Sequence, residues 1–404
     1  MNKTPRKSIF GVALDIGTTD IKGSLLDISS KKELAKASVP NEQKAFGQDV
    51  ITRLHLATKT GGLKELNKRA VSSINKLLIK LAKDASVDKR DIKKIVAVGN
   101  SAMYHLVLMV KPDTLAKAPF LPAEKRTQER NANKMGIDAA KDAIFRFLPN
   151  ISGFVGSDIL ASILATVIHK DKRYNLIMDM GTNGEIALGS NDRIFVTSCA
   201  SGPAFEARHI RCGMPAIDGA IIRAKVIRKK LSFKTVGSVS PKGISGSGLI
   251  DVISILLNKN IIDRRGRMRR KEFVIYKKKN KKIYLIQKDV RELQLAKAAL
   301  SAGIEILRRK TKIELDELNR FYITGTFGEG IDKKNARNIG LIPKEVFFGK
   351  IKFLKDGALS GAKKALLEKS SREEEIDSIL AKCEHIELHK DKEFEEVFAG
   401  AMNF

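Results

Sequence analysis

The chain has 404 residues, 43% hydrophobic and 30% charged, a balance typical of globular proteins with a sizeable buried core. Its 75 Lys and Arg against 46 Asp and Glu give a formal net charge of +29, which favours encounters with anions without choosing among them. No run of about 18 apolar residues occurs, so no membrane span is expected, and the absence of Trp with only 6% aromatic residues disfavours nucleic-acid binding by base stacking.

In chain order, the basic first eight residues lead directly into a strand pattern without an apolar h-region, so no secretory signal is predicted. Hydrophobic periodicity then predicts a strand–turn–strand over 10–28, helices over 64–85, 101–108 and 154–168, a strand over 95–98, and a loop-rich excursion over 112–149. A domain boundary is predicted near residue 170.

Beyond that boundary the pattern continues to alternate strands with helices, which indicates an α/β protein. The predicted elements are a strand–turn–strand over 176–189, strands over 194–198, 220–233 and 321–325, a hairpin over 272–276 and 283–287, and helices over 201–206, 243–257, 289–309, 358–368, 371–383 and 394–404. Asp289 is expected to cap the long helix that ends near Arg309.

One sequence pattern occurs twice. A short apolar run delivers Asp15 and then a polar turn with Gly17, Thr18 and Thr19, and a later run delivers Asp179 and then Gly181, Thr182, Asn183 and Gly184. An internal repeat at this interval predicts two related halves with a ligand bound between them.

The turns have the composition of a phosphate clamp. Glycines follow strands or open helices at four places: Gly17, Gly181, Gly246 with Gly248, and Gly325 with Gly328. Glycine lets backbone N–H groups approach phosphate oxygens, and the neighbouring Thr and Asn side chains can donate to the same oxygens. Asp15 and Asp179 would repel phosphate and suit Mg²⁺ held largely through water. An ordinary hairpin with a polar turn is the alternative for either copy alone.

Other common chemistries are not supported. The sequence contains no GxxxxGK[ST] loop, no GxGxxG after the first strand and no HExxH, and residues 243–247 are not a GxSxG elbow. Cys199, Cys212 and Cys383 are too widely spaced for a disulfide framework or a CxxC site. We therefore expect a cytoplasmic protein without a bound iron–sulfur cluster in this chain.

These turns resemble those of the actin-like ATPase superfamily of sugar kinases, Hsp70 and actin. A closer resemblance, over nearly the whole chain, is to the reductive activators of corrinoid proteins, which use ATP to help return an inactive Co(II) corrinoid to Co(I). The matching motifs lie at residues 15–19, 41–43, 46–50, 99–100 with 103, 154–158, 179–185, 202–206, 213–214, 246–251, 288–289 with 296–298, and 339–343. Each motif is weak alone, and their order makes the set specific.

The resemblance implies an α/β, two-lobed actin-like ATPase fold built from duplicated ribonuclease H-like domains. Residues 1–170 would form the first lobe, the middle domain of the family, and residues 171–404 the second lobe with the adenosine motif and C-terminal helices. The implied function is ATP-dependent reductive activation of a corrinoid protein, with ATP and Mg²⁺ as cofactors.

The resemblance also implies roles for individual residues. Asp15 and Asp179 would orient Mg²⁺, and Asn100, Glu185 and Glu206 would act on the attacking water. Phosphates would be held by Gly17, Thr18, Thr19, Gly181, Thr182, Asn183 and Gly184, and the nucleoside by Gly246, Ser247, Gly248, Gly325, Thr326 and Gly328. Alternative roles are a helix cap for Asn100, a strand-edge carboxylate for Glu185 and a first-turn helix residue for Glu206.

The chain departs from the family pattern in three ways. We expect it to lack the usual N-terminal [2Fe–2S] ferredoxin domain, and a separate ferredoxin-like electron donor is therefore expected as a partner beside the corrinoid protein. Ser245 stands where a cysteine is usual, and Thr326 stands where the adenosine turn usually has glycine.

Several alternatives stay open. A small-molecule kinase would use the same clamp, and so would a nucleotide-switched binding or chaperone-like module. Lys22, just after the first turn, could bind phosphate or point to solvent. The basic segment 264–282 could dock an acidic partner or be a solvated hairpin tip. Nucleic acid and membrane are disfavoured as partners, and a homodimer is one option for the oligomeric state.

Overall fold

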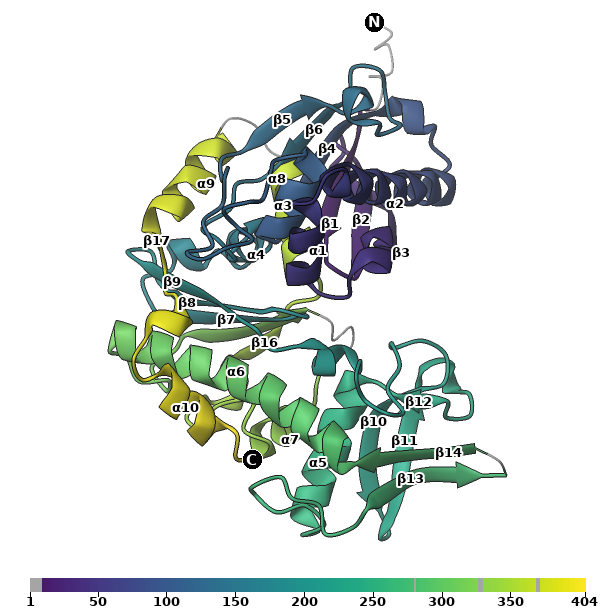
Figure 1. The fold of residues 1–404 in the computed structure, drawn as a ribbon, viewed down its shortest axis with the longest axis vertical. Helices are drawn as coiled ribbons and strands as arrows, with labels where there is room; N and C mark the ends of the chain where they lie inside the picture. The colour runs from purple at the N-terminus through teal and green to yellow at the C-terminus, as the bar shows by residue number, and fades with distance from the viewer. Residues whose placement is uncertain (1–8, 280, 326–329, 368–370) are drawn as a thin grey trace, which may run out of the picture. The chain divides into compact units, whose positions relative to one another are not determined.

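The structure is a computed structural model that describes residues 9–279, 281–325, 330–367 and 371–404 (Figure 1). The chain forms two compact units. Unit 1 contains the described residues up to His169 together with Gly357–His385, and unit 2 contains Lys170–Asp356 together with Ile386–Phe404. The chain therefore passes from one unit to the other three times. The segment Gly357–His385 belongs to unit 1, although residues 171–404 were expected to form one lobe.

Unit 1 is built on a six-stranded mixed sheet with the strand order β3-β2-β1-β4-β6-β5. Its strands are β1 (Phe10–Ile16), β2 (Asp20–Asp27), β3 (Lys32–Pro40), β4 (Ile92–Gly99), β5 (Gln128–Asn131) and β6 (Ile144–Phe147). Strands β1 to β3 form an antiparallel meander, and β4 runs parallel to β1. Because β1 and β4 are apolar along most of their length, they occupy the middle of the sheet, where both faces are covered.

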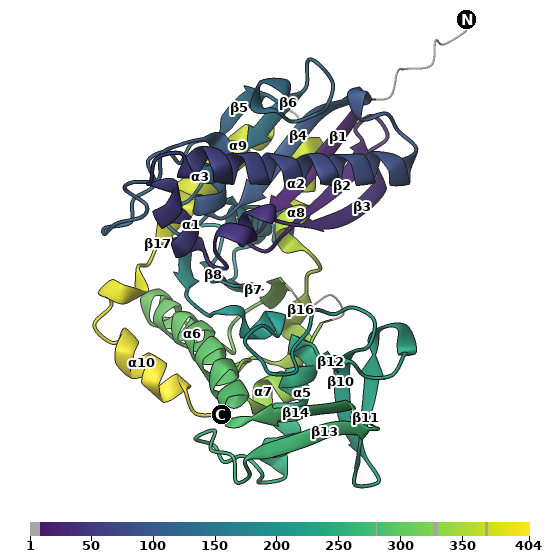
Figure 2. The same cartoon turned by 45° about the vertical axis from the view of Figure 1, so that its right-hand side comes forward.

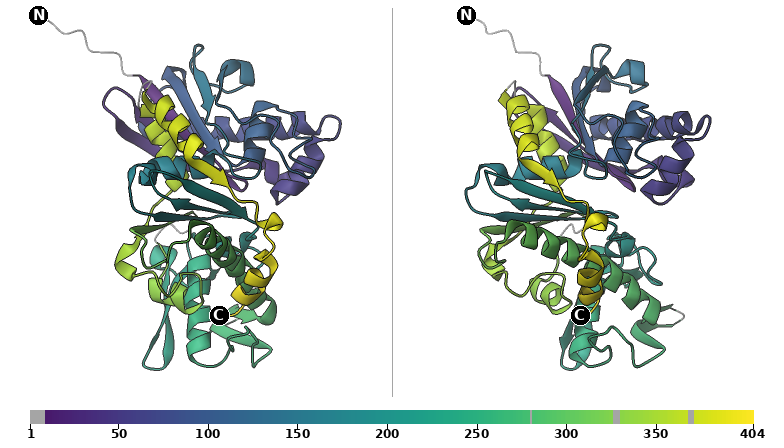
Figure 3. Two further views of the ribbon diagram at one scale, coloured as in Figure 1. Left: turned by 90° about the vertical axis from the view of Figure 1, so that its left-hand side faces the viewer. Right: turned by 60° about the vertical axis from the view of Figure 1, so that its left-hand side comes forward.

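Helices cover both faces of this sheet (Figure 3). They are α1 (Val50–Ala57), α2 (Gly62–Ala85), α3 (Ser101–Leu108), α4 (Ser157–Thr166), α8 (Gly357–Leu367) and α9 (Ser371–Lys382). Helix α2 buries Leu66, Ala70, Ile74 and Leu77 at a spacing of three and four against β2 and β3. Helix α8 packs on β1 and β4 from the opposite face.

Unit 2 contains a second sheet with the strand order β16-β15-β7-β8-β9. These strands are β7 (Asn175–Met180), β8 (Gly184–Gly189), β9 (Ile194–Cys199), β15 (Arg320–Gly325) and β16 (Ile351–Phe353). Strands β7 to β9 form an antiparallel meander, and β15 runs parallel to β7. Both large sheets therefore share one plan, in which Asp15 and Asp179 each lie one residue before the end of the first strand.

Besides this sheet, the described residues of unit 2 form two small sheets and several helices (Figure 2). One sheet has the order β11-β10-β12, and the other is a two-stranded hairpin of β13 and β14. Their bounds are β10 (Ala220–Ile227), β11 (Lys230–Thr235), β12 (Gly243–Ile244), β13 (Glu272–Lys278) and β14 (Lys281–Ile286). The helices are α5 (Gly246–Asn258), α6 (Gln287–Thr311), α7 (Lys333–Asn338) and α10 (Phe394–Ala401), and α10 lies along α6 in Figures 1 and 2.

Short elements complete the chain. The 3-10 helices are η1 (Glu42–Phe46), η2 (Lys89–Asp91), η3 (Asn133–Met135), η4 (Ile168–Lys170), η5 (Pro203–Glu206), η6 (Val236–Ser238), η7 (Phe348–Lys350) and η8 (Leu388–Lys390). Strand β17 (Cys383–His385) is the last element before the chain returns to unit 2. Among the described residues, no helix is both long and apolar enough to span a membrane.

Most predicted elements are confirmed, with four differences. The predicted loop over 112–149 contains β5 and β6, and the predicted strand over 220–233 is two strands joined by a two-residue turn. The predicted helix at 201–206 is only the 3-10 turn η5. Asp289 is the third residue of α6 and not its N-cap, but it contributes to capping from that position, because its carboxylate accepts hydrogen bonds from the backbone N–H groups of Ile286 and Arg211.

Candidate functional site

The first polar turn joins β1 to β2 and is held by a buried asparagine from outside the hairpin. The Gly17 N–H donates to the Asp20 carbonyl at 3.1 Å and closes the turn. Asn41, which is fully buried, donates its backbone N–H to the Thr19 carbonyl at 2.8 Å and its side-chain Nδ2 to the Gly17 carbonyl at 2.9 Å. The turn therefore has a fixed backbone before any ligand binds.

Asn100 connects this turn to the end of β4. Its Oδ1 accepts from the Met103 N–H at 3.0 Å. Asn100 is therefore the N-cap of α3, which confirms the helix-cap role given above as an alternative. Its Nδ2 donates to Thr18 Oγ1 at 3.0 Å, and both side chains are nearly buried. Since the Thr18 hydroxyl accepts this bond, its own proton is left to point at another acceptor.

Strand register places Lys22 on the same face as Asp15. The two residues are direct partners across the antiparallel pair of β1 and β2, and Asp15 is also opposite Val98 of β4. Directly opposed side chains of an antiparallel pair project from one face of the sheet. The Lys22 side chain therefore lies on the same face of the sheet as the Asp15 carboxylate, a direction that the sequence alone left open.

Asp158 is a carboxylate near Asp15 to which the sequence assigned no role. It is the second residue of α4, and its Oδ1 accepts the Ile159 N–H at 2.8 Å. Burial, with a smaller contribution from the negative charge of Asp15, raises the pKa of this carboxyl from 3.8 to about 7, against the lowering effect of the Ile159 N–H. Its position in the matched motif 154–158, at the start of a helix, was the available signal.

The second polar turn joins β7 to β8 and is held by residues from β9 and η5. The Gly181 N–H donates to the Asn183 carbonyl at 3.2 Å, and Ser201 Oγ lies 3.4 Å from the carbonyls of Gly181 and Thr182. Thr182 Oγ1 donates to Glu206 Oε1 at 2.7 Å. The predicted residues Thr182 and Glu206 are thus in contact within unit 2.

Glu206 is bound on both carboxylate oxygens. Its Oε2 lies 3.1 Å from Nε of Arg208, while Oε1 accepts the Thr182 hydroxyl. Because the hydroxyl hydrogen of Thr182 points to Glu206, the lone pairs of Oγ1 face outward and can accept from water or another donor. This contact makes Glu206 a positioning residue for Thr182.

A polar row crosses the second sheet at the level of Asp179. Register pairs Asp179 with Glu185 of β8 and with Thr324 of β15, and it pairs Glu185 with Ser198 of β9. Glu185 is 6% exposed. Two carboxylates on directly opposed strand positions repel each other unless a cation or a proton lies nearby. This arrangement suits Asp179 as a carboxylate for a hydrated divalent cation.

The glycines at the start of α5 have a packing role of their own. A Cβ on Gly246 would lie 1.9 Å from the Phe205 carbonyl oxygen, and a Cβ on Gly248 would lie 2.1 Å from that of Ile221. Ser247 Oγ donates to the Ile222 carbonyl at 3.0 Å, and Ser245 Oγ caps the helix by accepting from the Gly248 N–H. Close backbone packing therefore accounts for both glycines without a ligand.

The predicted adenosine turn is described only at its first residue. Gly325 has φ +108°, and a Cβ there would lie 2.4 Å from the Met180 carbonyl oxygen, so glycine is required where β15 ends beside β7. Thr326 and Gly328 lie outside the described residues. The first-turn residues are brought together in unit 1, and those of the second turn, α5 and β15 belong to unit 2.

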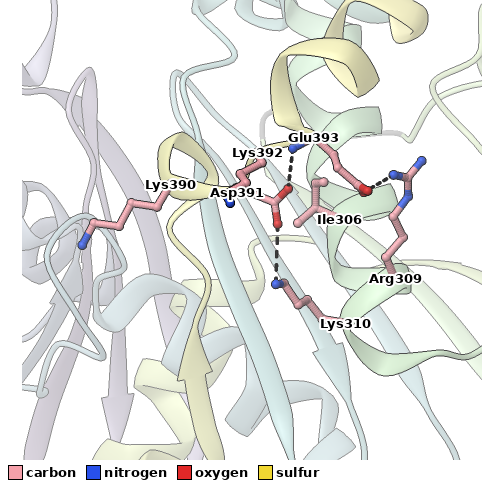
Figure 4. Close-up of a pocket in the computed structure, with 7 residues that line it drawn as sticks. All are labelled: Ile306, Arg309, Lys310, Lys390, Asp391, Lys392 and Glu393. Carbon is pink, nitrogen blue, oxygen red and sulfur yellow. Dashed lines mark hydrogen bonds and ion pairs between the residues drawn. The ribbon is translucent and has the colours of Figure 1, made fainter.

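A pocket of about 400 Å³ lies in unit 2 at the C-terminal end of α6 (Figure 4). Arg309 pairs with Glu393, and Lys310 Nζ lies 3.6 Å from Asp391 Oδ2, so acidic groups offset the basic ones. The pocket is lined by Ile306, Arg309, Lys310, Lys390, Asp391, Lys392 and Glu393, and by none of the predicted site residues. It is therefore not the predicted nucleotide site.

A metal site built from side chains alone is not found in the described part of the chain, where no three His, Cys, Asp or Glu residues gather. A Mg²⁺ ion that accompanies a nucleotide needs only one or two carboxylates, with phosphate and water as its other ligands. Asp15 and Asp179 fit that requirement chemically.

Comparison with known proteins covers almost the entire chain. Residues 10–171 match the family described as "RACo middle region", and residues 173–404 match the family described as "C-terminal domain of RACo the ASKHA domain". Corrinoid activation enzyme RamQ of Eubacterium limosum is 34% identical over an alignment that covers 97% of this chain and 70% of the relative.

Two further similarities agree. The Co(II) methylated amine-specific corrinoid protein reductase of Methanosarcina barkeri is 25% identical over 91% of this chain and 72% of its own length. A solved structure described as a reductive activator for corrinoid,iron-sulfur protein superposes with a TM-score of 0.91 and 33% identity, covering 99% of this chain and 67% of that one.

Proposed function

The chain belongs to the RACo family and has its actin-like ASKHA fold, and we propose that it is an ATP-dependent activator of a corrinoid protein. The activity would couple ATP hydrolysis to conformational work that permits one-electron reduction of Co(II) to Co(I) on the partner. The observation that carries the proposal is the 34% identity to a corrinoid activation enzyme over 97% of this chain.

In this proposal, ATP binding needs both polar turns. The hydroxyl of Thr18 would donate to a phosphate oxygen, and the glycine turns at Gly17 and Gly181 would let neighbouring backbone N–H groups approach the phosphates. Thr182, whose hydroxyl hydrogen points to Glu206, would accept a hydrogen bond from water at the nucleotide. Thr19, Asn183 and Gly184 complete the turns, and Lys22 would add a positive charge beside Asp15. The hydrogen bonds of Asn41 to the first turn and of Thr182 to Glu206 support preorganisation of both turns.

Mg²⁺, when bound with ATP, would neutralise phosphate charge and stabilise the negative charge that develops during transfer. Asp15 and Asp179 would hold it, mainly through coordinated water. Glu185, directly opposite Asp179 in the strand register, would accept hydrogen bonds from such waters.

Hydrolysis would transfer the γ-phosphoryl group to water. The attacking water forms a new P–O bond, the bond to the ADP oxygen breaks, and the water gives its proton to a base. We assign the base to Asp158, because its carboxylate lies close enough to Asp15 to feel its charge and sits on a rigid helix start. Asn100 would act as a positioning residue through Thr18.

The electron would come from a separate protein. The three cysteines of the chain are spread over 184 residues of sequence, and Cys199 is buried in the unit 2 core. Gly246, Ser247, Gly248 and Gly325, with Thr326 and Gly328, remain proposed for the nucleoside side.

The decisive test measures ATP hydrolysis by the purified protein with and without candidate corrinoid proteins, together with the Co(I) absorbance of the corrinoid. We expect Mg·ATP hydrolysis that a cognate corrinoid protein stimulates, and Co(I) formation that requires ATP and a reductant. Asp179→Ala should abolish Mg·ATP binding in calorimetry. Binding that survives Asp179→Ala, or ATPase activity that no corrinoid protein changes, would count against the proposal.

A further inference from the structure

Positive charge in unit 2 is concentrated in one stretch of 63 residues. Between Ala220 and Lys282 the chain places 19 of its 75 Lys and Arg but only three of its 46 Asp and Glu. A general excess of lysine would not deplete acidic residues from one segment. The stretch therefore differs from the rest of the chain, which has 56 Lys and Arg against 43 Asp and Glu.

The three acidic residues of this stretch do little to neutralise its surface. Asp251 is 1% exposed and accepts hydrogen bonds from the Ala224 N–H and from Asn335 Nδ2. Asp263 Oδ1 accepts the backbone N–H of Arg267, and Glu272 pairs with Lys282. All of the 19 basic side chains except that of Arg223 are exposed. The outer surface is consequently almost purely cationic.

Two hairpins carry the densest part of this charge to their tips. Strands β10 and β11 pair Ile227 with Lys230, so Arg228 and Lys229 form a two-residue turn. Strands β13 and β14 pair Lys278 with Lys281, so Lys279 lies at the second tip. Both hairpins belong to unit 2 and lie near each other in Figures 1 and 2.

The backbone at these tips is unfavourable for the residues present. Arg228 and Lys229 have φ values of +46° and +65°, and Lys279 has +47°. Such turns favour Asn-Gly or Asp-Gly, and the left-handed region costs a residue with Cβ about 1 kcal/mol or more. Cations thus occupy tip positions at which local backbone stability favours other residues.

The tip cations are not used inside the molecule. Within the described residues, the side chains of Arg228, Lys229 and Lys230, and of Lys277 to Lys279, form no hydrogen bond or ion pair. Nearby apolar side chains are also exposed: Val226 by 40%, Ile227 by 45% and Val274 by 38%. A surface with exposed aliphatic side chains among its cations suits a protein interface, in which apolar contact adds to charge attraction.

We propose that the outer surface of these two hairpins, termed the hairpin surface, docks an acidic face of the corrinoid protein partner. This inference rests on the proposed function, because it names the place where that partner binds. Charge complementarity would raise the association rate and orient the partner, with a smaller contribution to the lifetime of the complex.

Nucleic acid is the less favoured occupant of the hairpin surface. Phe233, Phe273 and Tyr276 are partly buried against the core, and the Tyr284 ring has Lys282 Nζ at 4.6 Å and Arg211 at 5.9 Å from its centroid. These rings are therefore not available as stacking platforms for bases. The exposed aliphatic side chains would also make no favourable contact with the phosphates of a nucleic acid.

The first experiment reverses charge at one tip and compares an equal change elsewhere. The test variant is Lys277→Glu/Lys278→Glu/Lys279→Glu, and the control is Lys64→Glu/Lys68→Glu/Lys80→Glu, three exposed positions of α2 in unit 1. Stopped-flow association with a corrinoid protein that stimulates the wild type should slow by at least about tenfold in the test variant at about 50 mM KCl. The control substitutions should change the association rate less than about twofold. The difference in association rate between the test variant and the wild type should shrink at about 500 mM KCl.

A second variant separates charge from turn geometry. Arg228→Asn/Lys229→Gly installs the residues that the turn prefers, so it should keep or raise the melting temperature while slowing association. The same association rate in this variant and in the triple test variant as in wild type would overturn the inference. The inference would also be overturned if the protein bound a nucleic-acid duplex of about 20 base pairs more tightly than the corrinoid protein at about 150 mM salt, and if the same variants lost that duplex binding.

Basal ATP hydrolysis distinguishes the two proposals. All these variants should hydrolyse ATP at the wild-type rate without a partner, since no altered residue belongs to the polar turns. Wild-type protein that lacks ATPase activity would refute the proposed function itself. Intact ATPase activity and partner stimulation with no effect of either hairpin variant would refute only the docking surface.

Discussion

At the scale of single residues, the two turn aspartates have different neighbours. Asp15 is opposed by Lys22 on the next strand, whereas Asp179 is opposed by Glu185. Opposite charges across a strand pair stabilise it, and like charges destabilise it. A cation bound in the proposed site would therefore stabilise the second turn more than the first, because it would relieve the repulsion between Asp179 and Glu185.

Asp158 is the residue whose replacement should separate stability from activity. Its pKa is raised to about 7 from 3.8, so the folded protein holds a proton that the unfolded chain releases near pH 4. Folding stability should therefore fall as pH rises from about 4 to about 7, and the cost should be fully present above pH 7. Asp158→Asn should raise the free energy of unfolding at pH 8 by about 1–3 kcal/mol and leave it unchanged at pH 4.

Denaturant unfolding in EDTA-containing buffer measures the stability effect, because metal and nucleotide would change the charge near Asp15. The same variant should lose about 10²–10⁴-fold of the ATPase rate if Asp158 is the base. Equal stability of wild type and Asp158→Asn at pH 8 would contradict the raised pKa. An unchanged ATPase rate would instead remove Asp158 from the proposed mechanism.

The sequence predicted the turn residues themselves better than their partners. Gly17, Thr18 and Thr182 stand in local turn patterns that are readable from neighbouring residues. The contacts of Asn100 with Thr18 and of Glu206 with Thr182 join residues 82 and 24 positions apart, so no local pattern contains them. The pKa of Asp158 likewise depends on burial and on its approach to Asp15.

At the scale of elements, the periodicity of apolar residues decided which helices and strands were predicted correctly. Helix α2 has a long apolar stripe, and its predicted range 64–85 nearly coincides with Gly62–Ala85. Strand β5 reads Gln-Glu-Arg-Asn and pairs only with β6 at the sheet edge, so its polar sequence gave no strand signal. The turn between β10 and β11 was missed because Arg228-Lys229 lacks the usual Asn or Gly.

Gly361 tests the packing of α8 against α4. A glycine inside a helix costs up to about 1 kcal/mol relative to alanine, so replacement usually stabilises. Here a Cβ on Gly361 would lie 1.9 Å from the Ala161 carbonyl oxygen, which is backbone and cannot rotate away. Gly361→Ala should therefore lower the free energy of unfolding by about 1–3 kcal/mol.

Gly400 in α10 provides the matched control for that substitution. A Cβ there would meet no atom within 4 Å, so Gly400→Ala should be neutral or slightly stabilising. Thermal unfolding of both variants measures the contrast. A Gly361→Ala protein as stable as Gly400→Ala would show that α4 and α8 can separate without cost.

Lys297 ties the C-terminal segment to α6. Its side chain is 1% exposed, and Nζ donates to the Ala401 and Asn403 carbonyls, while Gln294 Nε2 donates to the Met402 carbonyl at 2.8 Å. Burial lowers the pKa of Lys297 to about 8 from 10.5, so the unfolded chain binds this proton more tightly than the folded one.

The lowered pKa of Lys297 makes the folding stability of the protein depend on pH. Stability should rise between pH 8 and 10.5 by up to about 3 kcal/mol from this lysine, and the cost should be fully present below pH 8. Lys297→Met removes the titration and keeps the apolar length of the side chain. The stability difference between wild type and Lys297→Met should therefore change across this pH range, and a constant difference would contradict the lowered pKa.

At the scale of the whole molecule, the order of segments along the chain does not follow the division into units. The duplication of the meander predicted two related halves, and each unit does contain the same sheet plan. The return of Gly357–His385 to unit 1 could not be predicted, because α8 has an ordinary amphipathic pattern that fits any apolar surface. Only its packing on β1 and β4 identifies its partner.

Unit 1 should consequently fail to fold when it is cut at the predicted boundary. A fragment of residues 1–169 lacks α8, whose Leu359, Ala362 and Leu366 are at most 3% exposed, and it would leave the face of β1 and β4 open to water. Burying one leucine contributes about 2 kcal/mol, so losing the helix should remove most of the margin of a domain stable by about 5–15 kcal/mol.

The fragment should bind a hydrophobic dye and unfold without a cooperative transition, whereas co-expression with a segment of residues 355–385 should restore cooperative unfolding. A segment with Leu359→Asp and Leu366→Asp is the matched control and should not restore it, because buried charges cannot pack on the sheet. Cooperative melting of residues 1–169 alone would show that the sheet is covered without α8. In that case the boundary near residue 170 would mark an autonomous domain, and Gly357–His385 would be an accessory to it.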